Sequence, residues 1–343
     1  MGRKNSVSCF SVSGHSKAMA TGEKPEAPIF LVGATGTGKS AVAMELARTH
    51  ASFQGKAAIL AMDAMQVYRG ADIGTSKPSA AERAEFPHGG LDLVELAANF
   101  DVAQYLKHAE AFLQEQREAS RRVIIAGGTG LYFRALTRGL CEAPQGSDEL
   151  RAELNGLSVA ELQARLKAID PVMLERIDVA NPRRLVRAIE VKEATGRSLR
   201  EWQDETPEPL VREFSAFWIQ REKEELAARI EARVDEMFAR GWVEEVRELV
   251  AKHGAEAVQG FAGIGYREIG EMIASCSREM TSREPGQQVA RATKALKSNI
   301  CAATRQYAKR QLTWFAREPN LQAVILTGNQ TISAALSAAT MSL

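Results

Sequence analysis

The segment that decides the fold reads GATGTGKS, residues Gly33–Ser40, and it fits the phosphate-loop pattern G-x-x-x-x-G-K-[ST]. The apolar run IFLV comes directly before this segment, and AVAMELA, a good helix former, follows it. A strand, a glycine-rich turn and a helix N-terminus in this order surround phosphate oxygens with backbone N–H groups. The sequence therefore predicts a di- or triphosphate site, in which Lys39 reaches a distal phosphate and the Ser40 hydroxyl can hold Mg²⁺.

Outward from this loop, short β-rich runs alternate with helical stretches, which is typical of a parallel sheet covered by helices. We therefore predict an α/β fold: a P-loop NTPase-like parallel sheet with flanking helices, interrupted by a helical insertion domain. The predicted strands are Ile29–Val32, Ala57–Met62, Arg122–Ala126, Phe214–Ile219 and Gln322–Leu326.

The predicted domain organisation follows from where these strands stop. Residues 1–27 are expected to form a disordered leader, 28–142 the first part of the core, and 143–212 the helical insertion. Residues 213–328 complete the core with basic C-terminal helices, and 329–343 form a tail. In the insertion, Asp148 is expected to cap the first helix, and Pro182 suits a first helical turn.

Composition excludes several classes of protein. The 343 residues include 44 Lys and Arg against 43 Asp and Glu, for a net charge of +1, so a tail-driven nucleic-acid binder is excluded while a local basic patch is not. No apolar run approaches the roughly 20 residues of a membrane span. The four cysteines form no CxxC pair, which favours a reducing, cytoplasmic setting and argues against a zinc site.

The third predicted strand, RVIIA, argues against an ordinary nucleoside triphosphatase or kinase. Such enzymes usually carry an acid at the end of a hydrophobic strand to hold Mg²⁺, but here the strand runs into GGTG. The loop is therefore predicted to bind phosphate without machinery for γ-phosphate chemistry.

Polar residues at the carboxyl ends of the other strands indicate an active site, because ligands of open α/β sheets bind there. Asp63 is the first polar residue after a buried strand and is a candidate base or metal ligand, or alternatively a turn cap. Thr129 is a candidate site hydroxyl, or one that satisfies its own backbone. Tyr132 and Phe133 are expected to pack in the core, and His88 is expected to be structural.

The C-terminal stretch RATKALKSNICAATRQYAKRQLTWFAR, residues 291–317, holds seven Lys and Arg and no acid. Interleaved aromatic residues and one concentrated positive face suit a phosphate backbone, although a solvated cationic helix would show the same pattern. A second basic cluster in the insertion contains Arg183, Arg184 and Arg187. Together with the phosphate loop, these clusters indicate an enzyme that acts on nucleic acid.

The order of these motifs resembles that of the bacterial-type tRNA dimethylallyltransferases, also called isopentenyl-diphosphate:tRNA transferases. The resemblance spans Gly33 to Phe315, more than four fifths of the chain, and its most specific parts are DAMQVYRG and TRQYAKRQLTW. The other matching segments are GATGTGKS, FPHGGLDL, GGTGLYFRALTRGL, NPRRLVRAIEV, RIEARVDEMFARGWVEEV and GIGYREI.

The resemblance implies transfer of a dimethylallyl group from its diphosphate to N6 of adenosine 37 in tRNAs that read codons beginning with U. It implies Asp63 as general base, with Lys39 and Thr129 as the other catalytic residues, and Mg²⁺ as cofactor at Ser40. The residues expected to bind the diphosphate are Gly33, Ala34, Thr35, Gly36, Thr37, Gly38, Lys39, Ser40, Arg221 and Lys223.

The resemblance also implies a partner, the anticodon stem-loop of tRNA, and we expect a cytoplasmic monomer without membrane contact. The residues expected to contact tRNA are Asp63, Ala64, Met65, Gln66, Arg151, Arg183, Arg184, Arg187, Gly263, Tyr266, Arg267, Arg305 and Lys309.

The sequence departs from the family pattern in a few places. Lys223 stands where the family often has an Arg near the diphosphate, with Arg221 two residues earlier, so either cation can serve. Ala64 replaces a usual Ser after the base, and Ala262 replaces a frequent basic residue.

Three other functions compete with tRNA prenylation. An enzyme that prenylates free AMP, ADP or ATP would usually lack the insertion and the TRQYAKRQLTWF segment. A small-molecule kinase conflicts with the acid-free third strand. A non-catalytic RNA-binding protein would not need the intact Lys39, Asp63 and Thr129.

Overall fold

The computed structural model describes residues 26–50, 53, 55–205, 207–278 and 285–328. The predicted tail and nearly all of the predicted leader lie outside these residues. In the described part of the chain, six parallel strands form one sheet in the order β3-β2-β4-β1-β5-β6. The strands are β1 (Ile29–Gly33), β2 (Ala57–Met62), β3 (His88–Gly89), β4 (Arg122–Gly127), β5 (Ser215–Gln220) and β6 (Gln322–Ile325).

The parallel sheet confirms the predicted fold class, and all five predicted strands are present. The sixth strand, β3, was not predicted. It has only two residues, which pair with Ile59 and Leu60 of β2, and two residues are too few to show an alternating pattern. It includes His88, whose Nδ1 lies 2.8 Å from the Phe86 carbonyl, in keeping with a structural role.

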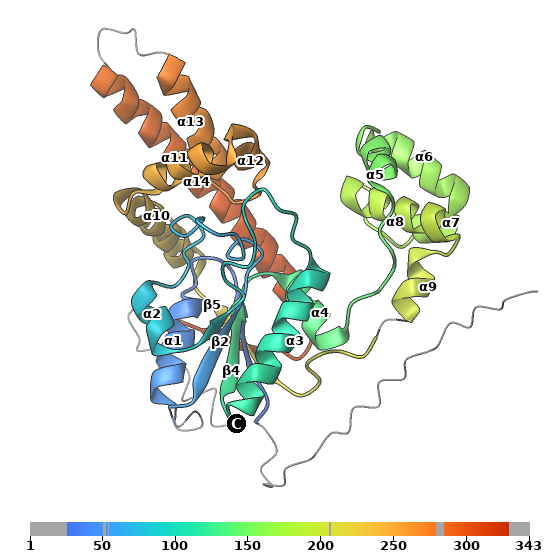
Figure 1. Ribbon diagram of the computed structural model, residues 1–343, viewed down its shortest axis with the longest axis horizontal. Helices are drawn as coiled ribbons and strands as arrows, with labels where there is room; N and C mark the ends of the chain where they lie inside the picture. Colours follow the sequence, from blue (N-terminus) through green and yellow to red (C-terminus); the bar gives the residue numbers. More distant parts are fainter. Residues whose placement is uncertain (1–25, 51–52, 54, 206, 279–284, 329–343) are drawn as a thin grey trace, which may run out of the picture.

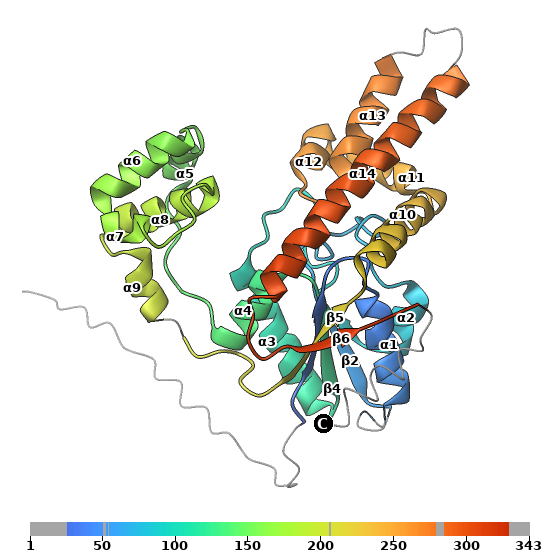
Figure 2. The same cartoon turned by 180° about the vertical axis from the view of Figure 1, so that it is seen from behind.

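Helices cover both faces of the sheet (Figures 1 and 2). On one face, α1 (Lys39–Thr49) packs on side chains such as Ile29 and Leu31; on the other, α3 (Val102–Glu118) and α4 (Gly130–Arg138) pack on Phe30 and Val32. Because successive side chains of a strand point to opposite faces, one apolar run supplies both layers. The short α2 (Ala80–Glu85) begins at a Ser79 capping box.

The strand order places the phosphate loop at a switch point of the sheet. β1 lies between β4 and β5, and the chain leaves β1 toward β2 but leaves β4 toward β5. Crevices at such points are where doubly wound sheets bind their ligands. The loops after β1, β2 and β4 therefore meet at one edge.

The described residues of the insertion form five helices and no strand. They are α5 (Asp148–Asn155), α6 (Val159–Ile169), α7 (Pro171–Leu174), α8 (Pro182–Thr195) and α9 (Leu199–Asp204). They enclose a separate core that includes Leu154, Leu166 and Ile189, and Figures 1 and 2 show them apart from the sheet. Pro182 opens α8 as predicted, but Ser147, not Asp148, caps α5, with its side chain accepting the Leu150 N–H.

The remaining helices extend from the edge of the sheet that carries the phosphate loop (Figure 2). They are α10 (Lys223–Ala239), α11 (Trp242–His253), α12 (Ala255–Gly260), α13 (Tyr266–Arg278) and the long α14 (Pro285–Phe315). Trp242 and Tyr266 centre their core, and Leu226, Ile230 and Ala308 pack against Ala34 of the phosphate loop. Helices α10 and α14 thus reach the site directly.

Candidate active site

The phosphate loop is shaped by its own Ala34 carbonyl. That oxygen accepts hydrogen bonds from Lys39 Nζ at 2.7 Å and from the Thr37 hydroxyl at 2.9 Å. Gly38 adopts a left-handed conformation, with φ of 93°, directly before α1, which favours glycine. The first N–H groups of α1, including those of Lys39 and the exposed Ser40, are those that a helix leaves without an internal acceptor. The loop is therefore ready to receive an anion.

Two guanidinium groups contact this loop, one from the residue directly after β5 and one from α10. Arg221 donates to the Thr37 carbonyl at 3.0 Å, and Arg229 donates to the Gly36 carbonyl at 2.9 Å. Arg221 also pairs with Glu225, and its side chain is only 8% exposed. Lys223, by contrast, is exposed. Of the two candidate cations near the diphosphate, Arg221 is the one in contact with the loop.

Lys39 is held in an unusual electrostatic setting. Burial and then the nearby Arg233 lower the pKa of Lys39 to about 7, while Asp63 acts in the opposite direction. Burial also lowers the pKa of Arg233, and Asp63 opposes that shift too. The predicted base, the loop lysine and a helix-borne arginine are thus mutually coupled charges at one point of the sheet edge.

The predicted base lies in a loop that is fixed on both sides. Asp63 accepts the Met65 N–H at 2.8 Å through Oδ1, so it does form the local turn that was the alternative reading. The Thr129 hydroxyl accepts the Ala64 N–H at 3.1 Å. Thr129 therefore satisfies a neighbouring loop, not its own backbone, and it ties the end of β4 to the residue beside Asp63.

Two tyrosines lie within electrostatic range of the Asp63 carboxylate. Burial and then Asp63 raise the pKa of Tyr132 on α4, and the same two causes raise the pKa of Tyr307 on α14. Tyr132 also stacks on Tyr105 at 3.9 Å between ring centroids, and it is buried together with Phe133, as predicted. Tyr132 thus belongs to the core beneath the site, and Tyr307 reaches the neighbourhood of the base from α14.

The rest of the segment after β2 is anchored to α11. The Glu245 carboxylate accepts the N–H groups of Asp72 at 2.9 Å and Ile73 at 2.6 Å, and the Tyr266 hydroxyl at 2.7 Å. The Gln66 amide donates to the carbonyls of Thr75 and Ser76, at 3.0 and 3.1 Å. The segment that carries Asp63 is therefore held by hydrogen bonds both to itself and to α11.

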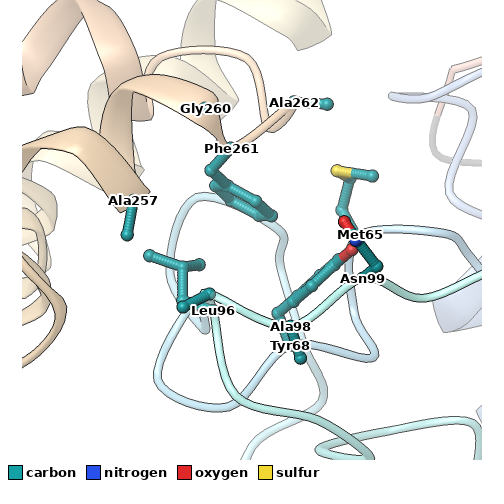
Figure 3. Close-up of a pocket in the computed structure, with 10 residues that line it drawn as sticks. Met65, Tyr68, Leu96, Ala98, Asn99, Ala257, Gly260, Phe261 and Ala262 are labelled. Atoms are coloured by element: carbon teal, nitrogen blue, oxygen red, sulfur yellow. The ribbon is translucent and has the colours of Figure 1, made fainter. Parts of the chain in front are cut away.

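A hollow of about 280 Å³ opens beside this segment (Figure 3). Met65, Tyr68, Leu96 and Asn99 line it from the loops after β2 and β3, and Phe261 faces them from the end of α12. The rings of Tyr68 and Phe261 meet edge to face at 5.1 Å. Flat aromatic and thioether surfaces of this kind suit a planar ring.

Several residues expected to contact tRNA have partners within the protein. Tyr266 is fully buried and bonded to Glu245, so it supports the fold. Arg151 forms two hydrogen bonds to the buried Glu190, at 2.6 and 3.2 Å. Arg187 donates to the carbonyls of Ala143 and Pro144, which fixes the start of the insertion. Tyr266 therefore has a packing role, whereas the side chains of Arg151 and Arg187 stay 38% and 32% exposed, so direct tRNA contact at these two arginines stays a prediction.

Other predicted contacts remain available on the surface. Arg183, Arg184, Arg267 and Lys309 are exposed.

Arg305 of α14 pairs with Glu231 of α10 at 3.0 Å, which partly neutralises the predicted basic face. Gly263 lies under Phe261 and Tyr266, where an added Cβ would meet the Phe261 ring at 2.4 Å, so its role is close packing.

The sequence interpretation missed the arginines on α10 and one amide on α14. Arg229 and Arg233 stand four residues apart in RIEAR, and this spacing on the helix that follows β5 is the signal that would have found them. Gln311 contacts both the phosphate loop and the β4 turn. Among the described residues no group of three His, Cys, Asp or Glu is placed to hold a metal ion.

Comparison with known proteins identifies one family of similar sequences. The family model described as IPP transferase matches residues 66–318. A tRNA dimethylallyltransferase of Methylacidiphilum infernorum is 43% identical over 85% of this chain and 83% of its own length. One from Geobacter metallireducens is 40% identical over 85% of this chain and 90% of its own.

Solved structures show the same similarity. A full-length tRNA isopentenylpyrophosphate transferase of Bacillus halodurans is 29% identical, with a TM-score of 0.61 over 92% of this chain and 95% of that one. A eukaryotic dimethylallyltransferase acting on tRNA, 21% identical, shares the fold with a TM-score of 0.75 over 92% of this chain and 78% of that one. This chain belongs to the IPP transferase family.

Proposed function

We propose that this chain transfers the dimethylallyl group of dimethylallyl diphosphate to N6 of adenosine 37 in tRNAs that read UNN codons. The observation that carries the proposal is the meeting of an anion-binding loop, with Lys39, and a fixed carboxylate, Asp63, at one switch point. The end of β4 supports it, because Gly127, Gly128 and Thr129 leave no acid there for γ-phosphate chemistry. The names of the relatives fit the same reaction.

In the proposed reaction, Asp63 serves the acceptor amine, and the phosphate loop serves the diphosphate leaving group. The N6 lone pair forms a bond to C1 of the allyl group while the C1–O bond breaks, and both electrons of that bond leave with diphosphate. Asp63 accepts the proton that N6 loses. The α1 N–H groups, Lys39 and the guanidinium of Arg221 stabilise the negative charge that develops on the leaving group.

The residues present fit a magnesium ion bound mainly through the diphosphate. Ser40 is exposed at the start of α1 and would hold the ion, and Mg²⁺ commonly takes one or two protein ligands together with phosphate oxygens. When bound, Mg²⁺ neutralises part of the diphosphate charge.

The acceptor is proposed to enter from the side of the hollow. An adenine that leaves the stack of an anticodon loop costs a few kcal/mol to unstack, and protein rings replace the lost contacts. The hollow with the Tyr68 and Phe261 rings lies on the segment that carries Asp63, and Tyr307 of α14 is within electrostatic range of that carboxylate. The exposed cations of α8 and α14 suit the phosphates of the stem-loop.

The test is incorporation of radiolabelled dimethylallyl diphosphate, with Mg²⁺, into unmodified total tRNA, free AMP, or no acceptor. We expect label in tRNA alone, and nuclease digestion should place it on one adenosine. Label in AMP would instead support a free-nucleotide prenyltransferase. ATP hydrolysis without label transfer would mean that the loop serves a nucleotide.

A matched variant tests the role of the base. Asp63→Asn keeps the oxygen that accepts the Met65 N–H but cannot take a proton at neutral pH. We expect kcat to fall by roughly 10²–10⁴, with tRNA affinity unchanged. Equal turnover in this variant would remove Asp63 from the proton transfer.

A further inference from the structure

One carboxamide on α14 links the two halves of the site. The Oε1 atom of Gln311 accepts the Thr35 N–H of the phosphate loop at 2.8 Å. Its Nε2 atom donates to the carbonyl of Gly128, beside Thr129, at 2.9 Å. One partner can only donate and the other can only accept, so together they fix the orientation of the amide. Gln311 is 6% exposed, and both ends of its side chain are satisfied.

The glycine turn after β4 is built to receive this helix. A Cβ on Gly128 would lie 2.1 Å from Nε2 of Gln311, and a Cβ on Gly130 would lie 2.3 Å from the Trp314 ring. The two glycines on either side of Thr129 thus allow two side chains of α14 to approach closely. The same end of the helix is held by Glu318, which pairs with arginines of α4.

From this turn the contacts continue to the base. The Thr129 hydroxyl accepts the Ala64 N–H, and Asp63 accepts the Met65 N–H. A continuous set of hydrogen bonds therefore runs from the diphosphate loop, through Gln311 and the turn, to the loop of the base. Transfer between a donor and an acceptor depends on their separation, because an error of about 1 Å can cost about 10²-fold in rate.

We propose that Gln311 is a positioning residue, which sets the separation between the diphosphate loop and the Thr129 turn and hence between the two reactants. This inference rests on the proposed function. Gln311 touches neither the loop carbonyls that face Arg221 and Arg229 nor the Asp63 carboxylate, so it acts through Thr35 and Gly128.

Two substitutions separate positioning from stability. Gln311→Met keeps the length of the side chain but makes neither hydrogen bond. Gln311→Glu cannot donate to Gly128 when ionised, but its protonated form offers both a donor and an acceptor, and burial raises the pKa of such a carboxyl. The control is Ile300→Val on the same helix, a buried change in the distant cluster that contains Trp242.

The measurements are the single-turnover rate of transfer to tRNA, calorimetric binding of inorganic diphosphate with Mg²⁺, and Tm. We expect Gln311→Met to lower the rate by about 10- to 100-fold at every pH, and to weaken diphosphate binding by about tenfold. For Gln311→Glu, the rate relative to the parent enzyme should rise at least about tenfold as pH falls from 8 to 6.

The proposal would be overturned if both Gln311 variants lost no more rate than Ile300→Val does for the same loss of Tm, and if the rate of Gln311→Glu relative to the parent enzyme did not change with pH. If the parent enzyme labels neither tRNA nor AMP, the proposed function fails instead. The diphosphate titration then still decides the inference: unchanged affinity in Gln311→Met overturns the link to the loop, and weakened affinity upholds it.

Discussion

Raising the pH should weaken diphosphate binding because Lys39 must gain a proton when the ligand arrives. The pKa of this lysine is lowered from 10.5 to about 7 by burial and by Arg233. At pH 8 about nine in ten free Lys39 side chains are then neutral. A bound diphosphate favours the ammonium form and returns the pKa toward its ordinary value, so binding takes up about 0.9 proton at pH 8.

The sign of the effect follows from the direction of the shift. Near pH 6 most Lys39 side chains are already charged, so the lysine no longer limits affinity. Between about pH 7 and pH 10 each unit of pH should raise Kd about tenfold, because a proton must be taken from an increasingly proton-poor solution. A phosphate ester whose last pKa is near about 6 is already fully ionised in this range and contributes little.

The assay is calorimetric titration of dimethylallyl diphosphate, with Mg²⁺, at pH 8 in buffers of different ionisation enthalpy. The slope of observed enthalpy against buffer enthalpy gives the number of protons taken up. Lys39→Met is the control for other groups, and Lys39→Arg retains a charge that does not titrate here. The reasoning would be refuted if the unsubstituted protein took up no more protons than Lys39→Met and its Kd did not change from pH 7.5 to 9.

Three substitutions test other parts of the site. Glu245→Ala removes the acceptor of neighbouring backbone N–H groups and should lower the free energy of unfolding by about 2–4 kcal/mol in urea, whereas the exposed Glu248→Ala should change it little. A Gly130→Ala change drives a methyl group into the α14 indole and should lower kcat at least about tenfold, while Gly270→Ala, where the methyl group makes only an ordinary contact with Val258, should not; equal rates in a labelling assay would argue against close seating of the turn. Finally, Lys309→Glu should weaken tRNA binding and reduce the salt slope of log K by about one or two, and an unchanged slope would show that this cation is only solvated.

Residues at strand ends could be predicted because their place depends on the strand alone. Lys39, Asp63 and Thr129 each follow an apolar run, and parallel strands deliver their carboxyl ends to one edge. The structure brings these three residues to one site. The short β3 escaped prediction because its pairing depends on β2 and not on a pattern of its own.

Residues on helices were harder to place. Arg233 and Gln311 reach the site only because α10 and α14 pack over the phosphate loop. How these helices pack depends on the tertiary structure and cannot be read from the local sequence. The same limit applies to Arg151, whose internal partner could not be predicted. A basic residue on a helix has the same pattern whether it faces RNA or an internal acceptor such as Glu190, because the acceptor lies on a different helix.

The position of β1 within the sheet has a consequence for the order of folding. Ile29 pairs with Ile124 on one side and with Ser215 on the other, so the second partner is synthesised only after the whole insertion. Closing such long loops is slow, whereas the helices of the insertion form from local contacts. A nascent chain should therefore carry a folded insertion while the edge of β1 is still open. Such an open, apolar strand edge exposes the chain to aggregation, so expression yield should respond more to substitutions in β5 than to equal changes in α8.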